Sequence, residues 1–242
     1  MAIPIAYNIR NLIVRKTTSI MTALGIALTV AVLLAILALV NGLRTSFESS
    51  GHPLQAIITR KGADSEVVSS ITRGVFQDLK NAPGIAKAKN GDPMASLEVI
   101  TLINLPSREY PEGINITVRG LLPIGFEMRD GIQLKSGRLF TEGRREIVVG
   151  RQIADNNPDA GLGKRVKFGR GEWEVVGVMD AGKGSSNSEI FADLNQLAGD
   201  YNRTETANSA LVRATDGPTL DALIQSLNDD VRLNVQARNE KD

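Results

Sequence analysis

Cysteine is absent from this chain of 242 residues, and histidine occurs only once. The lack of cysteine excludes a disulfide framework, a thiolate metal site and a cysteine nucleophile. The single histidine, His52, leaves little for histidine-based metal binding or acid–base chemistry. It follows the long apolar segment described below and precedes Pro53, so we expect it on the surface close to a membrane. The sequence therefore predicts no catalytic residue, no metal site and no cofactor.

The chain also lacks an excess of charge of one sign, because it contains 28 basic and 27 acidic residues. The two signs are unevenly distributed along the chain. Residues 1–43 contain three basic residues, Arg10, Arg15 and Lys16, and no acidic one, so the remaining 199 residues carry 25 basic and 27 acidic residues. A domain without a basic surplus has no electrostatic footprint for a polyanion, and we expect no nucleic acid among the partners.

One long hydrophobic run is present, and it carries no charged side chain from residue 17 to residue 43. Its densest part, residues 20–40, is interrupted only by Thr22 and Thr29. At about 1.5 Å per residue this part forms a helix of roughly 31 Å, the thickness of a bilayer's hydrocarbon core. The alternatives are a cleaved signal peptide, whose apolar region is typically about 7–15 residues long, and a buried core helix. The length of the run and the lack of a cleavage site favour a retained transmembrane helix over residues 17–43.

The charges that flank this span predict its orientation. Arg10, Arg15 and Lys16 precede it, whereas the first basic residue after it is soon offset by an acidic one. The positive-inside rule then keeps the N-terminus in the cytoplasm and exports the C-terminal domain to the periplasm or the outer surface. These three residues are the predicted topology determinants. Residues 1–16 are predicted to form a cytoplasmic segment at the membrane interface.

Small residues recur along the apolar span. Ala23, Ala27, Ala31 and Ala35 follow one another at every fourth position, with Gly25 on an adjoining stripe. Small side chains let membrane helices approach closely, so these five residues are the predicted packing surface for a partner helix. A chance recurrence of alanine, which is common in membrane helices, is the alternative.

The remainder, residues 44–242, predicts an α+β protein in which the helical anchor is followed by a mixed α/β extracytoplasmic domain. Alternating and short apolar runs predict strands at 54–60, 95–105, 114–119, 146–149, 165–168, 173–178, 209–213 and 231–235, and apolar faces at helical spacing predict helices at 66–81 and 218–227. Trp173 is expected in the core, and residues 181–188 are expected to form a mobile surface loop. We predict a terminal α/β lobe, at about 50–120 and 205–236, and a β-rich lobe inserted at about 121–204.

The nearest match to a phosphate-binding loop, residues 177–184, lacks a decisive residue. Gly184 stands after Lys183, where a Ser or Thr would have to hold Mg²⁺. We therefore expect no nucleotide site here.

Several segments together resemble the MacB-like and FtsX-like family of ABC transporter permeases. They are the basic start and apolar helix (NIRNLIVRKTTSIMTALGIALTV, 8–30), VRGLLPIGFEMRDGIQLKSGRLF (118–140), REIVVG (145–150), LGKRVKFGRGEWEVVGV (162–178) and SEIFADL (188–194). Each segment alone is a common pattern of strands and glycine turns. Their order behind one N-terminal membrane helix makes the resemblance specific, and it covers most of residues 1–235.

This resemblance implies a permease subunit, or its N-terminal portion, in the bacterial inner membrane. Such a subunit couples a partner ABC ATPase to an extracytoplasmic domain, for export or for extraction of lipoproteins and amphiphiles, as in proteins of the LolE type. ATP hydrolysis is then expected in the partner, and the chain itself is not expected to be an enzyme. The implied partners are the ATPase subunit, the membrane, further membrane helices in cis or in trans, and a second copy in a homodimer.

Permeases of this family normally continue into three further membrane helices, whereas no second apolar run follows in this sequence. We therefore expect a fragment, the product of a truncated gene, or one half of a split permease. The alternative function is a single-pass, membrane-anchored periplasmic binding or scaffold module without transport activity.

Overall fold

The computed structural model describes residues 13–48 and 51–241, and the chain forms two compact units, residues 1–48 and 49–242. The first unit contains helix α2 (Lys16–Glu48), whose segment Lys16–Gly42 is long and apolar enough to cross a membrane. The helix extends beyond the predicted end at residue 43, because no proline interrupts the polar residues that follow. Thr22 and Thr29 donate hydrogen bonds to the carbonyl oxygens of Thr18 and Gly25, so these hydroxyls are satisfied within the helix.

The second unit, here called the sheet domain, is built on one ten-stranded sheet with the order β12-β1-β11-β3-β4-β9-β6-β8-β5, in which β7 pairs with β8. The strands are β1 (Gln55–Arg60), β3 (Ala95–Leu105), β4 (Ile114–Leu121), β5 (Gln133–Gly137), β6 (Glu146–Gly150), β7 (Arg165–Phe168), β8 (Gly171–Asp180), β9 (Glu189–Asp193), β11 (Ser209–Arg213) and β12 (Val235–Asn239). A two-stranded sheet pairs β2 (Ile71–Thr72) with β10 (Thr206–Ala207). The helices are α3 (Arg73–Lys80), α4 (Pro123–Glu127), α5 (Arg151–Asn156), α6 (Leu194–Asp200) and α7 (Gly217–Asp229), with 3₁₀ turns η1 (Pro158–Ala160) and η2 (Ser185–Ser188).

The hairpin of β3 and β4 lies at the centre of the sheet and joins its two ends. Strands β12, β1 and β11 from the two ends of the domain pair on one side of it, and β9, β6, β8 and β5 from the middle of the chain continue on the other. Neighbouring strands are antiparallel except for the pairs β4 with β9 and β6 with β8. The sheet is therefore continuous from one end of the domain to the other.

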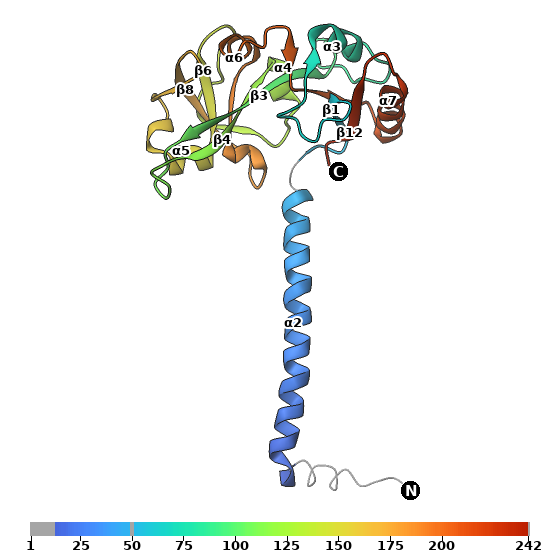
Figure 1. The fold of residues 1–242 in the computed structure, drawn as a ribbon, viewed down its shortest axis with the longest axis vertical. Coiled ribbons are helices and arrows are strands. Elements are labelled where there is room, and N and C mark those ends of the chain that lie inside the picture. Colours follow the sequence, from blue (N-terminus) through green and yellow to red (C-terminus); the bar gives the residue numbers. More distant parts are fainter. Residues whose placement is uncertain (1–12, 49–50, 242) are drawn as a thin grey trace. The chain divides into compact units, whose positions relative to one another are not determined.

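One face of the sheet is apolar and is covered by helices. Because successive side chains alternate between faces, Ile58, Leu97, Val99, Val118 and Ile190 all point to this side and are buried. The same core contains apolar side chains of three helices: Phe76 and Leu79 of α3, Leu194 and Leu197 of α6, and Leu220, Leu223 and Leu227 of α7. In Figure 1, α3 and α6 lie along the top of the sheet domain and α7 lies at its right-hand end.

The other face has two parts. Over β4, β6, β8 and β9, a smaller apolar cluster forms from Leu121, Val148, Val176, Met179 and Phe191, with Phe126, Ile132 and Phe140 packed against it. Phe126 contacts Phe191 edge-on, with 5.2 Å between the ring centroids. Over β1, β11 and β3 and the adjoining parts of β4 and β9, the same face carries polar side chains, among them those of Gln55, Glu98 and Arg119, and this part holds the candidate site.

Most predicted elements are found, and three strands have the predicted bounds: 95–105, 165–168 and 209–213. Trp173 is fully buried and stacks on Phe168, with 5.0 Å between the ring centroids, which confirms its predicted place in the core.

The helix predicted over residues 66–81 was wrong at its start, because α3 begins only at Arg73. The carbonyl oxygens of Glu66 and Val67 accept hydrogen bonds from the side chain of Asn208, at 3.1 and 2.9 Å, instead of continuing a helix. The Thr72 hydroxyl then caps α3 by accepting from the Val75 N–H.

The last strand was also misplaced. Residues 231–235 were predicted, whereas β12 starts at Val235 and Val231 is 85% exposed. A turn precedes the strand, with Asn234 at φ 50°, a left-handed conformation that asparagine tolerates.

Residues 181–188 contain the turn η2, and Asn187 within it is buried. The Asn187 side chain accepts from the Ala181 N–H and donates to the Gly182 carbonyl, at 2.9 and 2.8 Å. The small and polar residues of this loop predicted only a mobile surface segment. In the structure the Asn187 side chain links the two ends of the loop by hydrogen bonds.

Candidate functional site

Five adjoining strands bring polar side chains together on the face of the sheet opposite to the helices. Ser209 lies across from Glu98, Ile100 lies across from Arg119, and Glu189 pairs with Thr117. This register puts Glu98, Arg119, Glu189 and Ser209 on one face, together with Gln55 of β1. The polar cluster is thus a product of strand pairing between segments that are far apart in the sequence.

Arg119 is the centre of this cluster. Its Nη1 donates to Glu66 Oε1 at 3.2 Å and to Glu98 Oε2 at 2.7 Å. Its Nη2 donates to Glu66 Oε2 and to Glu189 Oε1, both at 3.2 Å. Three carboxylates therefore surround one guanidinium whose side chain is only 12% exposed.

A second guanidinium, that of Arg129, contacts the most buried carboxylate of the cluster. Arg129 Nη2 donates to both oxygens of Glu98, at 2.8 and 2.9 Å, and its Nη1 donates to the Gly125 carbonyl at 2.7 Å. Glu98 is 1% exposed and accepts from two arginines. Burial of a carboxylate at this depth is tolerated only with such charged partners.

The electrostatics of the cluster follow from the competition between burial and pairing. Burial raises the pKa of Glu66, but the charge and hydrogen bonds of Arg119 outweigh it and hold this pKa below its usual value. Burial lowers the pKa of Arg119, but Glu189, Glu98 and Glu66 raise it well above its usual value. Glu66 and Arg119 are therefore both charged at neutral pH.

A cavity of about 320 Å³ opens beside the cluster, and His52, Asp130 and Glu240 belong to its lining. The His52 backbone N–H donates to Glu240 Oε2 at 2.8 Å, and the His52 Nε2 lies 3.4 Å from Asp130 Oδ2. Burial raises the pKa of Glu240, whereas burial and the nearby Arg213 lower that of His52. His52 was expected on the surface, but its side chain is only 28% exposed and belongs to the cavity wall.

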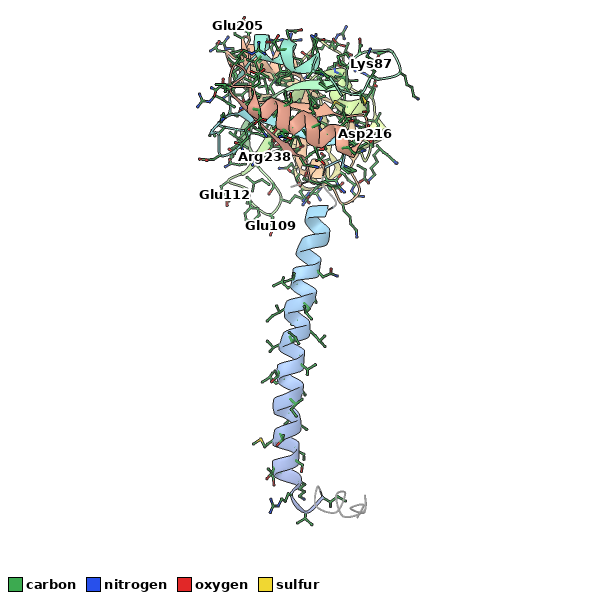
Figure 2. All side chains as sticks on the ribbon, turned by 90° about the vertical axis from the view of Figure 1, so that its right-hand side faces the viewer. Lys87, Glu109, Glu112, Glu205, Asp216 and Arg238 are labelled. Atoms are coloured by element: carbon green, nitrogen blue, oxygen red, sulfur yellow. The ribbon has the colours of Figure 1, made fainter. Side chains whose placement is uncertain are left out.

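This arrangement is suited to binding and to rigidity. Both terminal nitrogens of Arg119 are engaged by carboxylates, and the Ser209 hydroxyl donates to Glu66 Oε1 at 2.6 Å, so these groups are held in place by charged partners. Within residues 13–48 and 51–241, no group of three or more acidic or histidine side chains is arranged to hold a metal ion. Other charged side chains lie on the outside of the domain, as Figure 2 shows for Lys87, Glu205, Asp216 and Arg238.

The residues predicted from the sequence to be functional lie elsewhere, on α2. Within that helix the side chains of Ala23, Ala27, Ala31 and Ala35 are exposed, and a Cβ added to Gly25 would meet nothing within 4 Å. Their role in helix packing stays a prediction. Arg15 and Lys16 lie at the start of α2, whereas Arg10 and most of the predicted interfacial segment lie outside the described residues.

Sequence reasoning missed the polar cluster, although one signal pointed to it. Glu98 alternates with apolar neighbours, which is typical of a strand with one face in solvent, but residues 95–100 are buried on both faces. Arg119 likewise is a charged residue between Val118 and Gly120 of β4, in a strand that reads as alternating. Charged residues inside otherwise apolar strands were the available signal, and their pairing required the strand order.

A membrane-length helix followed by this sheet domain fits a membrane-anchored protein with an extracytoplasmic domain. The sequence matches the model of the MacB-like periplasmic core domain over residues 19–230, and the chain belongs to this family. A comparison with curated proteins gives no match.

Two solved structures share the fold. The periplasmic region of MacB from Actinobacillus actinomycetemcomitans is 16% identical, with a TM-score of 0.56 over 79% of this chain and 91% of that one. The extracellular domain of the noncanonic ABC-type transporter YknZ from Gram-positive bacteria is 19% identical, with a TM-score of 0.56 over 76% of this chain and all of that one. Both matched regions lie outside the cytoplasm, one periplasmic and one extracellular.

Proposed function

We propose that the chain is the membrane subunit, or the N-terminal portion, of an ABC transporter of the MacB, FtsX and LolE type. The observation that carries this proposal is the extent of the family match, which begins inside α2 and continues through α7. Helix and sheet domain therefore belong to one family unit. A partner ATPase hydrolyses ATP in the cytoplasm, and the chain itself is not an enzyme. The transporter exports its substrate, or extracts lipoproteins or other amphiphiles from the membrane.

In this proposal α2 lies in the bacterial inner membrane with its N-terminus in the cytoplasm. Arg10, Arg15 and Lys16 set this orientation, because basic residues are retained on the cytoplasmic side. The sheet domain then lies in the periplasm or outside the cell.

Residues 51–55, the first of the sheet domain, are closely connected to the sheet and can pass a movement on to it. They lead into β1, which pairs with β12 over five positions, from Ala56 with Asn239 to Arg60 with Val235. Gly51 fits against Glu240 so closely that an added Cβ would lie 2.9 Å from the Glu240 carbonyl oxygen. A displacement of residues 51–55 would therefore be passed to two strands of a continuous sheet.

The small-residue stripe on α2 supplies the contact with other membrane helices, either further helices of the permease or those of a second copy. Ala27→Leu would obstruct this surface, since close packing needs small side chains. Leu33→Phe is the matched control, because at about 100° per residue position 33 lies roughly 80° or more around the helix from each of the five small residues.

The test is purification of the tagged full chain from native membranes in mild detergent, followed by measurement of bound ATPase and of vanadate-sensitive ATP hydrolysis. We expect an ABC ATPase in stoichiometric amount with the wild type and with Leu33→Phe, and a clear loss with Ala27→Leu. Recovery of a stable, folded chain without any ATPase would contradict the transporter and support the anchored binding or scaffold module.

A further inference from the structure

The strand order of the large sheet ends in β12 on one side and in β5 on the other, and each of these end strands pairs on one side only among residues 51–241. The open side of such a strand presents backbone N–H and C=O groups to which another chain can add a strand. On β5 the register with β8 shifts between Leu134 and Ser136, next to the exposed Lys135. Irregular pairing and a lysine both hinder strand addition. β12 pairs with β1 in one unbroken register, so its open side needs another means of protection.

The backbone groups of β12 point alternately toward β1 and away from it, as in any antiparallel pair. The N–H of Glu240 points toward β1, because it donates to the Gln55 carbonyl oxygen at 2.9 Å. By alternation, the N–H and C=O groups of Val235, Ala237 and Asn239 point away from the sheet. These are the groups that a further strand would use.

A side chain of helix α7 occupies this open side at its central residue. Asn228 Oδ1 accepts from the Ala237 N–H at 2.8 Å, and Asn228 Nδ2 donates to the Ala237 carbonyl oxygen at 3.1 Å. These are the two hydrogen bonds that the residue opposite Ala237 on an added strand would make. Helix α7 packs against β12 at the right-hand end of the sheet domain in Figure 1, so the helix that covers this end of the core also carries the blocking amide.

With this amide removed, the open side of β12 is complementary to a second copy of itself. In an antiparallel pair about a two-fold axis, Ala237 lies opposite Ala237 and Val235 lies opposite Asn239, so all the outward backbone groups meet partners. Gln236 then lies opposite Arg238, and no two charges of one sign face each other directly. Both of these side chains are on the face away from α7, because Val235 and Ala237 belong to the core under the helices.

We propose that Asn228 keeps β12 closed to pairing with a second copy of this chain. An amide side chain has both a donor and an acceptor, so it satisfies both groups of Ala237 at once, which an alanine side chain cannot do. Pairing through β12 first requires that both of these hydrogen bonds be broken. The inference goes beyond the transporter proposal and does not rest on it, and it leaves a dimer formed through α2 possible, since that contact lies in the other unit.

The test is disulfide formation between two copies of the full chain, which has no cysteine of its own. Two differently tagged chains, one with Gln236→Cys and one with Arg238→Cys, are co-expressed, purified in detergent under reducing conditions and oxidised with copper phenanthroline. Residues directly opposite in a non-hydrogen-bonded pair have Cα atoms about 4.5 Å apart, within the range of a disulfide. With Asn228→Ala in both chains, the yield of the mixed disulfide dimer should rise about tenfold or more over chains that retain Asn228.

Ile224→Ala is the matched control. Ile224 lies on α7 and packs against the same core, so its truncation loosens the helix but leaves Asn228 in place. We expect no rise in the mixed dimer with this variant. Thermal unfolding followed by the fluorescence of Trp173, the buried single tryptophan, verifies that each variant is folded.

Equal yields of the mixed dimer with and without Asn228 would overturn the proposal. The same holds for an equal rise with Ile224→Ala, or for disulfides between like cysteines that form as readily as the mixed one, because neither result needs the predicted register. If Asn228→Ala does not fold, Asn228→Ser replaces it, since the serine side chain is too short to reach both groups.

Amide hydrogen exchange of the wild type decides independently of any variant. After correction for intrinsic rates, the Ala237 N–H should exchange about tenfold or more slowly than the Asn239 N–H, which also points away from the sheet. Equal rates would show that Asn228 does not protect the open side of β12, and would overturn the proposal.

Discussion

The two faces of the central sheet bury side chains equally well but by different physics. Leu97 and Glu98 are neighbours on β3 and are 2% and 1% exposed. Leu97 belongs to the apolar core under the helices, whereas Glu98 accepts hydrogen bonds from Arg119 and Arg129 on the other side. Burial alone therefore does not reveal what a position does.

Substitutions on the two faces should also reduce the free energy of unfolding in different ways. On the helix-covered face the stabilisation is roughly proportional to the apolar area buried, so each truncation costs a limited and local amount. On the polar face each charge depends on a named partner, and removal of one leaves the others buried without compensation. Predictions that separate the two faces are given below from the largest effect to the smallest.

The largest effect is expected from Arg119→Met, which leaves Glu66, Glu98 and Glu189 without their shared guanidinium. The loss in free energy of unfolding at pH 7.5 should be about 3–5 kcal/mol, the cost typical of breaking a buried ion pair from one side. Without Arg119 the pKa of Glu66, which burial raises, is no longer held down, so Glu66 takes up a proton as the pH falls. The deficit should therefore shrink at pH 5, measured by urea unfolding with Trp173 fluorescence.

Lys87→Met is the control for this variant, because Lys87 is exposed and removal of its charge should change little. A deficit for Arg119→Met that is below about 1 kcal/mol, or that is the same at both pH values, would contradict the role assigned to the cluster.

The matching change on the apolar face is Leu97→Ala. It should cost about 3 kcal/mol, within the range observed for large-to-small core substitutions. No titratable group is removed or left unpaired, so the deficit should be the same at pH 7.5 and at pH 5. A pH-dependent deficit in the same urea experiment would show that the two faces are coupled rather than distinct.

A smaller effect is expected from Asn187→Ala, which removes the two hydrogen bonds that the Asn187 side chain makes within residues 181–188. The expected loss is about 1–2 kcal/mol, with faster amide exchange confined to this loop. Ser186→Ala is the control, and the readout is hydrogen–deuterium exchange with mass spectrometry. Unchanged exchange in Asn187→Ala would mean that other contacts hold the loop.

The smallest expected effect is on how steeply the thermal stability of the protein falls at acidic pH. Hydrogen bonds from Arg138, at 2.6 and 2.7 Å, lower the pKa of Glu146 from 4.5 to about 2. Because the folded pKa is depressed, this contribution is present above pH 4.5 and is lost as the pH falls toward 2. Tm measured from pH 6 to pH 2 should fall less steeply for Glu146→Gln than for the wild type. Parallel curves would exclude this pair as a source of acid sensitivity.

The strands were predictable because their signal is local. Alternation and β-branched residues mark 95–105 and 209–213 correctly, and the family resemblance follows from such segments in order. The polar cluster was not predictable, because Glu66, Glu98, Arg119 and Glu189 come from four separate segments and meet only through strand order. The late start of α3 within the helix predicted at 66–81 has the same origin, since Asn208 donates to carbonyl oxygens more than 130 residues away.

The most direct measurement is the side of the membrane on which the sheet domain lies. The chain has no native cysteine, so Lys87→Cys gives a single exposed thiol. A membrane-impermeant maleimide should label it fully in cells whose outer barrier is open and whose inner membrane is intact, with a cytoplasmic cysteine protein unlabelled. Labelling of Lys87→Cys only after the inner membrane is lysed would place the domain in the cytoplasm and contradict the proposed transporter subunit.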